Sequence, residues 1–326
     1  MKIGVIRFSS IGDIILCTPL LRWLRENIND AEIIFLTKKS FTHLLKDNPN
    51  VDKVLAWDDE EGKHVWKSLP FDFIIDLHNN LRSRRVLLSH WFVPVSRLDK
   101  QNIRKALMVV FRNSSLFKCT PITDRIMNTI CSLGDCRSFS PTLDYFNFSE
   151  PKKVQIPKTY GIIVLGGSFK TKQIPESKII EIINKGNNNW VLIGGTQDVE
   201  TATNVVSKCE SVKEVINLVG QISIPESAYL IQGANIVISS DTGMYHIAVA
   251  LGKQVAVFWG NTVPEMGMLA PVKGIGNVWH YEVGNLGCRP CSKLGFDNCP
   301  KGHFRCMMDQ NIDPLFVEIE KILEST

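Results

Sequence analysis

A short loop near residue 240 carries residues whose types and spacing suit a phosphate ligand. The apolar run 236–239 passes into Ser-Ser-Asp-Thr-Gly, and a helical pattern follows with His246 in its first turn. Ligands of open α/β sheets lie beyond the carboxyl ends of the strands. The Thr242-Gly243 turn presents backbone N–H groups at a helix N-terminus, which favours an anion. The sequence therefore predicts phosphate binding at this turn.

A second strand-to-helix loop, residues 165–176, contains glycines, hydroxyl groups and a cation. Its glycines allow the backbone to approach a ligand closely, Ser168 and Thr171 offer hydroxyls, and Lys172 offers a positive charge. The loop matches neither the Walker A pattern nor Gly-x-Gly-x-x-Gly, which disfavours nucleotide hydrolysis and dinucleotide binding. Two interpretations remain open, a phosphate-binding loop and an ordinary surface turn.

Two other loop positions are candidates for framing a nucleoside. Gly194 follows the strand-type run 190–193, and Glu226 stands near the start of a helix opened by Pro225. Either residue could instead belong to an ordinary connection between a strand and a helix.

The loop between the first strand and the first helix carries Asp13. A carboxylate in the first turn of a helix is favoured by the macrodipole, and Asp commonly caps helices. The functional alternative is a general base that projects into a cleft and accepts a proton from a hydroxyl.

Four cysteines near the C-terminus have spacings that could hold a metal ion. Cys288, Cys291, Cys299 and Cys306 are separated by two, seven and six residues. A set of four thiolates can bind tetrahedral Zn²⁺, and His303 could compete as a ligand. A packed loop of free thiols and a redox pair are the alternatives.

Strand-type and helical patterns alternate along the chain, which predicts βαβ units and parallel sheets. The stretch 138–160, punctuated by three prolines, is the expected linker. We therefore expect two doubly wound domains, with a last helix at 314–323 that could pack back across the first domain. The expected strands are 3–8, 32–37, 51–57, 71–77, 160–165, 190–193, 214–217, 236–239 and 255–258.

The composition is that of a soluble globular protein. The chain has 326 residues, of which 44% are hydrophobic and 21% charged. No apolar run approaches the ~20 residues that span a bilayer, and the chain begins directly in a strand-type run, so we expect a cytoplasmic protein. Its nine cysteines are expected to be reduced thiols.

The positive charge is concentrated in residues 76–137, which contain 11 basic and 4 acidic residues. Such an excess suggests an acidic partner, namely a phosphate, a carboxylated glycan or an anionic membrane surface. A solvated helical face rich in arginine is the alternative. Within this stretch, Trp91-Phe92-Val93 could contact a membrane interface, although core packing is the more common role for such residues.

Taken together, these motifs resemble glycosyltransferase family 9, the ADP-heptose:lipopolysaccharide heptosyltransferases. The resemblance rests on Arg-x-Ser-x-x-Gly-Asp at residues 7–13, Asp-Leu-His-x-x-x-Arg-Ser at 76–83, Asp-Thr-Gly-x-x-His at 241–246 and the cysteine segment. It implies the GT-B architecture, with two Rossmann-like domains that face a central cleft. Residues 1–155 would then bind the acceptor, and residues 156–326 would bind the nucleotide-sugar donor.

For the donor side, the resemblance implies an inverting transfer from ADP-heptose. Asp13 would deprotonate the acceptor hydroxyl as it attacks C1 of the sugar. No metal or other cofactor would be required, since fixed N–H groups and a lysine would stabilise the leaving diphosphate. The implied donor-binding residues are Ser168, Lys172, Gly194, Glu226, Asp241, Thr242, Gly243 and His246.

For the acceptor side, the resemblance implies an anionic lipid A–Kdo type acceptor at the inner face of the inner membrane. Ser10, Arg82, Arg84 and Arg85 would contact it, and the arginines suit its carboxylates or phosphates. We expect a peripheral, monomeric protein without a nucleic-acid partner. The alternatives are another nucleotide-sugar transferase or an epimerase of the same fold, and a catalytically silent glycan- or nucleotide-binding protein.

Overall fold

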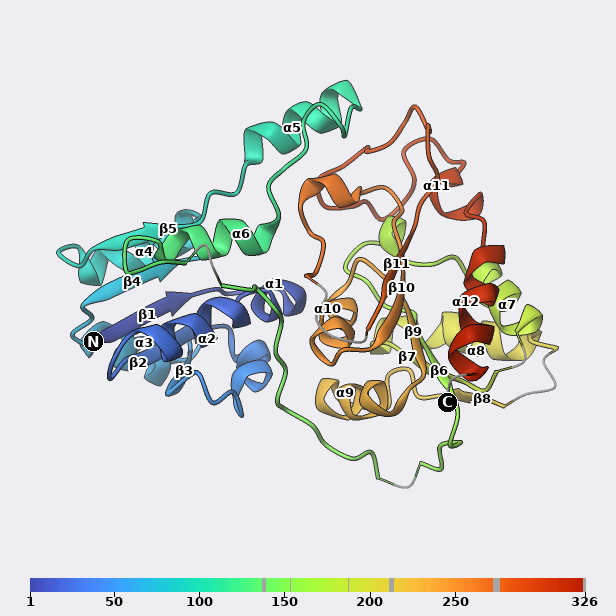
Figure 1. Cartoon of the computed structure of the whole chain (residues 1–326), viewed down its shortest axis with the longest axis horizontal. Coiled ribbons are helices and arrows are strands. Elements are labelled where there is room, and N and C mark those ends of the chain that lie inside the picture. Colours follow the sequence, from blue (N-terminus) through green and yellow to red (C-terminus); the bar gives the residue numbers. More distant parts are fainter. Residues whose placement is uncertain (137–138, 153, 187, 211–213, 272–275, 325–326) are drawn as a thin grey trace. The chain divides into compact units, whose positions relative to one another are not determined.

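A computed structural model describes residues 1–136, 139–152, 154–186, 188–210, 214–271 and 276–324 of the chain (Figure 1). These residues form two compact units. The first unit comprises Met1–Gln101, Thr120–Asn147 and Leu269–Pro271. The second comprises Asn102–Cys119, Phe148–Met268 and the described residues after Pro271.

The first unit contains a parallel sheet of five strands in the order β3-β2-β1-β4-β5. Its strands are β1 (Lys2–Ile6), β2 (Glu32–Thr37), β3 (Lys53–Ala56), β4 (Phe73–Asp76) and β5 (Val95–Arg97). Its helices are α1 (Ile11–Ile15), α2 (Thr18–Asn27), η1 (Lys39–Leu45), α3 (Glu60–Ser68), α4 (Leu81–Leu87), η2 (Leu88–His90), α6 (Ile122–Met127) and η3 (Asn128–Ile130). The central strands are apolar on both faces and buried, as expected for a parallel sheet covered by helices.

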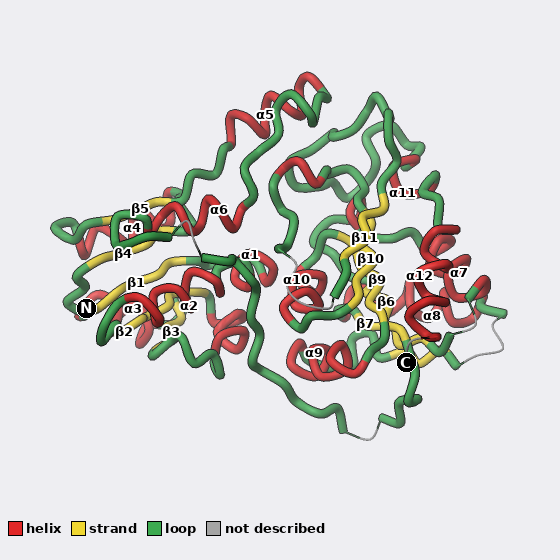
Figure 2. Tube along the Cα trace, viewed as in Figure 1, coloured by secondary structure: helices red, strands yellow, loops and turns green. Residues whose placement is uncertain are grey.

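The second unit contains a parallel sheet of six strands in the order β11-β10-β9-β6-β7-β8. Its strands are β6 (Gly161–Val164), β7 (Trp190–Ile193), β8 (Val215–Asn217), β9 (Ile236–Ser240), β10 (Gln254–Phe258) and β11 (Val278–Tyr281). Its helices are α5 (Asn102–Phe111), η4 (Lys170–Lys172), α7 (Glu176–Lys185), η5 (Thr196–Asp198), α8 (Val199–Lys208), α9 (Ile224–Gly233), α10 (Gly243–Ala250), η6 (Pro264–Met266), α11 (Arg305–Met308) and α12 (Asp313–Glu324). Helices α9 and α10 lie on one side of the sheet, and α7, α8 and α12 lie on the other (Figure 2).

Two expectations about chain organisation differ from the structure. The chain passes into the second unit after Asn147, before the expected boundary at residue 155. The segment Asn102–Cys119, expected in the first domain, belongs to the second unit, because Met108 packs in one apolar cluster with Val263 and Met266. Residues 138 and 153 of the expected linker lie outside the described part of the chain.

The last helix, α12, belongs to the second unit. Its Leu315 and Ile319 are buried in the core of the second unit, beside residues of α7 such as Ile182. The helix is therefore part of the second fold.

Two further differences concern the first helix and a pair of cysteines. The apolar spacing of residues 14–27 predicts one helix, but the structure has two, α1 and α2, because Pro19 stands in the first turn of α2 and lacks the N–H that a continuous helix requires. Cys131 and Cys136 form a disulfide, so the expectation of reduced thiols is wrong for this pair.

Within the described residues, no helix has both the length and the apolar character that crossing a bilayer requires.

Candidate functional site

Each sheet has a topological switch point, and the predicted residues gather at both. In the first unit, β2 and β3 lie on one side of β1, and β4 and β5 lie on the other. The loops after β1 and β4 therefore leave the sheet in different directions. Open α/β sheets bind ligands in the crevice between two such loops. Asp13 follows β1, and the Asp76-Leu77-His78 element begins with the last residue of β4.

Asp13 is held at this place by a capping interaction and an ion pair. The backbone N–H of Ser10 donates to Asp13 Oδ2 at 3.1 Å, and the Ser10 hydroxyl donates to the same oxygen at 3.0 Å. The Arg7 guanidinium lies 2.7 Å from that oxygen. Both the cap and a site role are thus compatible with the geometry of Asp13, and its role as a base stays a prediction.

The charge of Asp13 is set by these neighbours. Burial favours the protonated form, but the Arg7 cation and the hydrogen bonds from Ser10 outweigh it, so the pKa of Asp13 is lowered to about 2. Arg7 is itself fixed, because it donates to the carbonyl of Leu77 at 2.6 Å and to that of Ser9 at 2.9 Å. Asp13 is therefore an oriented, ionised carboxylate at neutral pH.

His78 and Lys100 share this neighbourhood, and the sequence analysis assigned a role to neither side chain. Burial and the cations Arg7 and Lys100 lower the pKa of His78 to about 4, so its ring is neutral near pH 7. Its Nδ1 is buried and has no hydrogen-bond partner among the described residues. Burial also lowers the pKa of Lys100. His78 lies in a recognised motif, whereas nothing in the sequence around Lys100 points to a site.

The carboxylate of Asp76 shapes the loop that carries His78. It accepts hydrogen bonds from the backbone N–H groups of His78 and Asn79, at 3.0 and 2.7 Å, and from the Ser83 hydroxyl at 2.7 Å. Asp76 is fully buried. It is therefore a positioning residue for the β4–α4 loop.

The predicted acceptor-binding residues lie on two different elements of the first unit. Ser10 is exposed and caps α1 beside Asp13. Arg82, Arg84 and Arg85 are exposed on α4. Arg82 contributes to the lowered pKa of His78. Because each helical residue turns by about 100°, Arg82 and Arg84 point to nearly opposite sides of α4, so the structure does not bring the three arginines onto one face.

In the second unit, the switch point lies between β6 and β9. The lysine loop follows β6, and the Asp-Thr-Gly turn follows β9. Lys172 Nζ lies 2.5 Å from Asp241 Oδ2, and both side chains are largely buried. A Cβ built on Gly167 would lie 3.5 Å from Thr242 Cγ2, so the two loops are in contact. The structure thus joins the two predicted parts of the donor site.

The Asp-Thr-Gly turn leads directly into α10. Thr242 is the N-cap residue, Gly243 is the first helical residue, and the Thr242 hydroxyl lies 3.1 Å from that of Ser239. His246 is buried in the first turn with its ring 4.6 Å from the ring of Tyr245. Ser168 is exposed in the lysine loop. The helix N-terminus and Lys172 therefore offer positive charge at one place.

Gly194 and Glu226 have local structural partners. A Cβ on Gly194 would lie 3.1 Å from Asp198 Oδ2, whose carboxylate also accepts from the Gly195 N–H at 2.9 Å. Glu226 forms a capping box with Ser223 at the start of α9, and these hydrogen bonds lower the pKa of its carboxyl group. Their roles toward a donor stay predictions.

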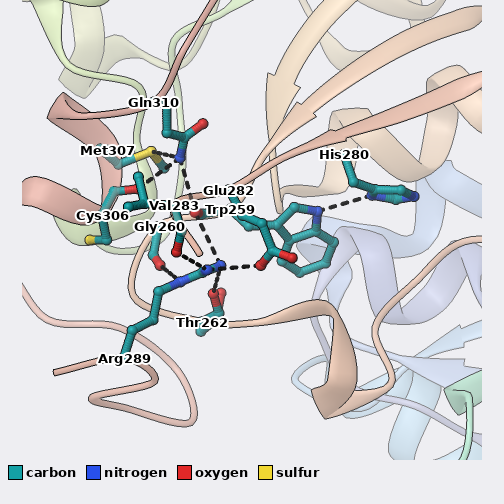
Figure 3. A network of polar contacts seen from close by, with 10 residues as sticks. All are labelled: Trp259, Gly260, Thr262, His280, Glu282, Val283, Arg289, Cys306, Met307 and Gln310. Atoms are coloured by element: carbon teal, nitrogen blue, oxygen red, sulfur yellow. Dashed lines mark hydrogen bonds and ion pairs between the residues drawn. The ribbon is translucent and has the colours of Figure 1, made fainter. Parts of the chain in front are cut away.

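The cysteine segment contains a residue that the sequence analysis passed over. Arg289 is buried and donates to the carbonyls of Gly260, Thr262 and Trp259 at 2.6, 3.0 and 3.3 Å (Figure 3). It also lies 2.8 Å from a carboxylate oxygen of Glu282. The arginine of Cys-Arg-Pro-Cys thus fixes the loop after β10.

The four cysteines line one cavity of about 210 Å³ in the second unit, together with His303 and Asn261. Cys288 Sγ lies 3.8 Å from His303 Nε2. Within the described part of the chain, however, no three Cys, His, Asp or Glu side chains are grouped as metal ligands. The structural zinc site at the four cysteines, one of the alternatives that the sequence left open, stays a prediction.

Comparisons with known proteins agree with this geometry. A family model described as glycosyltransferase family 9 (heptosyltransferase) matches residues 65–291. Lipopolysaccharide heptosyltransferase 1 of Campylobacter coli is 23% identical over 296 residues, which cover 80% of this chain and 84% of that protein.

Solved structures extend the likeness over the whole fold. A glycosyl transferase family 9 structure from Veillonella parvula has a TM-score of 0.77 at 18% identity, covering 100% of this chain and 98% of that one. An E. coli heptosyltransferase with ADP-2-deoxy-2-fluoro heptose has a TM-score of 0.63 at 17% identity, covering 100% of both chains. The predicted GT-B fold is confirmed. The chain belongs to glycosyltransferase family 9 and is a glycosyltransferase.

Proposed function

We propose that this enzyme transfers a heptose from ADP-heptose to the inner-core Kdo or heptose region of a lipopolysaccharide acceptor, with inversion at the anomeric carbon. The relative from Campylobacter coli is named a lipopolysaccharide heptosyltransferase, and a similar E. coli structure contains a fluorinated ADP-heptose. These names support the choice of donor and acceptor.

One observation carries the proposal, namely the position of Lys172 at the start of α10. Lys172 Nζ lies 2.5 Å from Asp241, directly before the N-terminus of that helix. When the bond between sugar C1 and the diphosphate breaks, negative charge develops on the diphosphate. A fixed cation and oriented N–H groups stabilise such charge most strongly at a dry, preorganised site.

The remaining predicted donor residues would complete this binding. The hydroxyls of Thr242 and Ser168, the backbone of Gly243 and the ring of His246 would contact the diphosphate, and Asp241 would orient Lys172 or contact the sugar. Gly194 and Glu226 would frame the nucleoside. Because these groups supply the positive charge, we propose that no metal ion is required, and full activity in EDTA would support this.

On the acceptor side, Asp13 would accept the proton. The acceptor oxygen attacks C1, the bond from C1 to the diphosphate oxygen breaks, ADP leaves, and the hydroxyl proton passes to Asp13. A carboxylate with a pKa of about 2 is a weak base toward a free hydroxyl. The hydroxyl becomes strongly acidic as its oxygen bonds to C1, so a late proton transfer suits this carboxylate.

The acceptor would be held by Ser10, Arg82, Arg84 and Arg85 of the first domain, with Arg82 and Arg84 contacting different parts of it because they lie on nearly opposite sides of α4. We propose that the protein acts as a monomer, peripheral to the inner face of the inner membrane, where a lipid A–Kdo type acceptor would be presented.

A nucleotide panel tests the proposal. Thermal unfolding is measured with ADP, UDP, GDP, CDP and ADP-heptose, since a ligand at a hundred times its dissociation constant adds about 2.7 kcal/mol of stability. We expect shifts with ADP and ADP-heptose alone, and NMR of the transfer product should show an inverted anomeric centre. A preference for UDP or GDP would reject the heptosyl assignment.

A further inference from the structure

Helix α5 carries its apolar stripe on the side that faces solvent. Ile103, Leu107, Val110 and Phe111 occupy positions i, i+4, i+7 and i+8, which form one helical face. All four side chains are exposed, and Ile103, Val110 and Phe111 are between 64 and 79% exposed. In an ordinary surface helix such a stripe faces the core, so this face is built to be covered by something else.

The opposite side of α5 attaches the helix to the second unit. Met108 is fully buried against Val263 and Met266. The backbone N–H of Cys119, at the end of the returning segment, donates to the carbonyl of Glu265 at 2.8 Å. The segment is therefore anchored, and its orientation fixes the stripe outward.

The turn after α5 extends the exposed apolar surface. The rings of Phe111 and Phe117 are stacked with their centroids 5.6 Å apart. Leu116, beside them in the chain, is 72% exposed. The apolar surface thus continues from the helix into the turn.

All charged residues of this segment are basic. Residues 102–119 contain Arg104, Lys105, Arg112 and Lys118, and no Asp or Glu. Arg104, Arg112 and Lys118 are exposed. Basic residues beside an exposed apolar helical face are the composition of helices that lie in the interface of an anionic membrane.

We propose that residues 102–118 form a membrane-docking element that inserts the stripe Ile103, Leu107, Val110 and Phe111, with Leu116, into the headgroup region of an anionic bilayer. A second copy of the chain fits less well, because a symmetric contact would place like charges together. This inference rests on the proposed function in one respect, since a membrane-bound acceptor gives the docking a purpose.

Vesicle sedimentation tests the docking without donor or acceptor. The full chain is mixed with vesicles of phosphatidylglycerol and phosphatidylcholine, or of phosphatidylcholine alone. We expect binding to the anionic vesicles, reduced about tenfold or more in the triple variant Ile103→Ser, Val110→Ser, Phe111→Ser and in the double variant Arg104→Glu, Lys118→Glu. Val317→Ser, at an exposed apolar position of α12, is the matched control and should bind normally.

Hydrogen exchange locates the contact. On vesicle binding we expect new protection in residues 102–118. Unchanged binding of both variants would overturn the proposal, as would protection only at a second exposed apolar group, Leu88, Trp91 and Phe92. A dimer in solution that the triple variant converts to a monomer would assign the stripe to a second copy.

Transfer to a water-soluble, deacylated acceptor separates this inference from the proposed function. The docking variants should keep that activity while losing vesicle binding. A wild-type chain that binds anionic vesicles but transfers nothing would reject the proposed function and leave the docking element standing.

Discussion

Lys172 Nζ lies 2.5 Å from Asp241 Oδ2, and this ion pair joins the loops that follow the adjacent strands β6 and β9. Their side chains are 17% and 8% exposed, so each charge depends on the other for neutralisation. The pair places a cation directly before the N-terminus of α10. Its removal therefore has two separable consequences, one for stability and one for anion binding.

We expect Lys172→Met to weaken ADP binding about 10- to 100-fold, because a hydrogen bond to a charged group contributes about 1.5 to 3 kcal/mol. The variant should also unfold more easily, since Asp241 is left buried without its partner. Isothermal titration with ADP and urea unfolding measure the two effects.

The double variant Lys172→Met, Asp241→Asn separates them. It should recover stability but not ADP affinity. Lys185→Met, which removes an exposed ion pair with Asp313, is the matched control and should change neither property. Recovery of ADP binding in the double variant would exclude Lys172 as a diphosphate ligand.

We expect Asp13→Asn to lower heptose transfer about 100- to 10,000-fold, the usual contribution of a general base. Asn also caps helices well, so the start of α1 should be preserved. Affinity for ADP should not change, because Asp13 and the donor residues belong to different units. Turnover by steady-state kinetics and ADP titration measure the two quantities.

Asp59→Asn provides the control for this substitution. Asp59 caps α3 and accepts from the N–H of Gly62 at 3.4 Å, so the same chemical change is made at another helix start. Its turnover should equal that of the wild type. Wild-type turnover in the Asp13 variant would eliminate Asp13 as the base.

The sheets, and the positions of the two loops that carry Lys172 and Asp241, could be predicted because their residues are informative locally. Runs such as 32–37 and 190–193 are apolar on both faces, which parallel strands require, and they form β2 and β7 as expected. By contrast, β5 (Val-Ser-Arg) is short, and β11 is only partly buried. Neither sequence carries an apolar run strong enough to distinguish it from a loop.

The parts of the site that could not be predicted from the sequence depend on contacts between residues that are distant in the chain. Lys100 follows β5 and meets the charges of Arg7 and Asp76 only because those strands lie in one sheet. Likewise, Trp91 and Phe92 were expected more often in the core, yet both are highly exposed. Side-chain type predicts burial on average, but the local turn decides which way a given ring points.

We expect Arg289→Met to lower the free energy of unfolding by about 3 kcal/mol or more. The substitution leaves Glu282 and the carbonyls of Gly260 and Thr262 without their donor, and an unpaired buried group is costly. Urea unfolding measures the change. Arg305→Met removes an exposed pair with Asp309 and should cost little. Equal stabilities for the two variants would contradict the structural role of Arg289.

Stability should fall as pH drops from about 6.5 toward 4, partly because of His78. An unfolded histidine binds a proton near pH 6.5, whereas burial and the cations Arg7 and Lys100 lower the pKa of folded His78 to about 4. Between these pH values the unfolded state binds the proton and the folded state does not, so acid favours unfolding.

Replacing His78 by Gln should therefore flatten the pH dependence. Between pH 7.5 and 5 we expect the wild type to lose about 1 kcal/mol more than His78→Gln, after allowance for solvent screening at a half-buried site. His43, His90 and His280, whose pKa values are also lowered, retain part of the slope in both proteins. His64→Gln, at an exposed position of α3, is the control. Identical slopes for the wild type and His78→Gln would mean that folding does not lower the pKa of His78, and a ring that stays neutral down to about pH 5 would be ruled out.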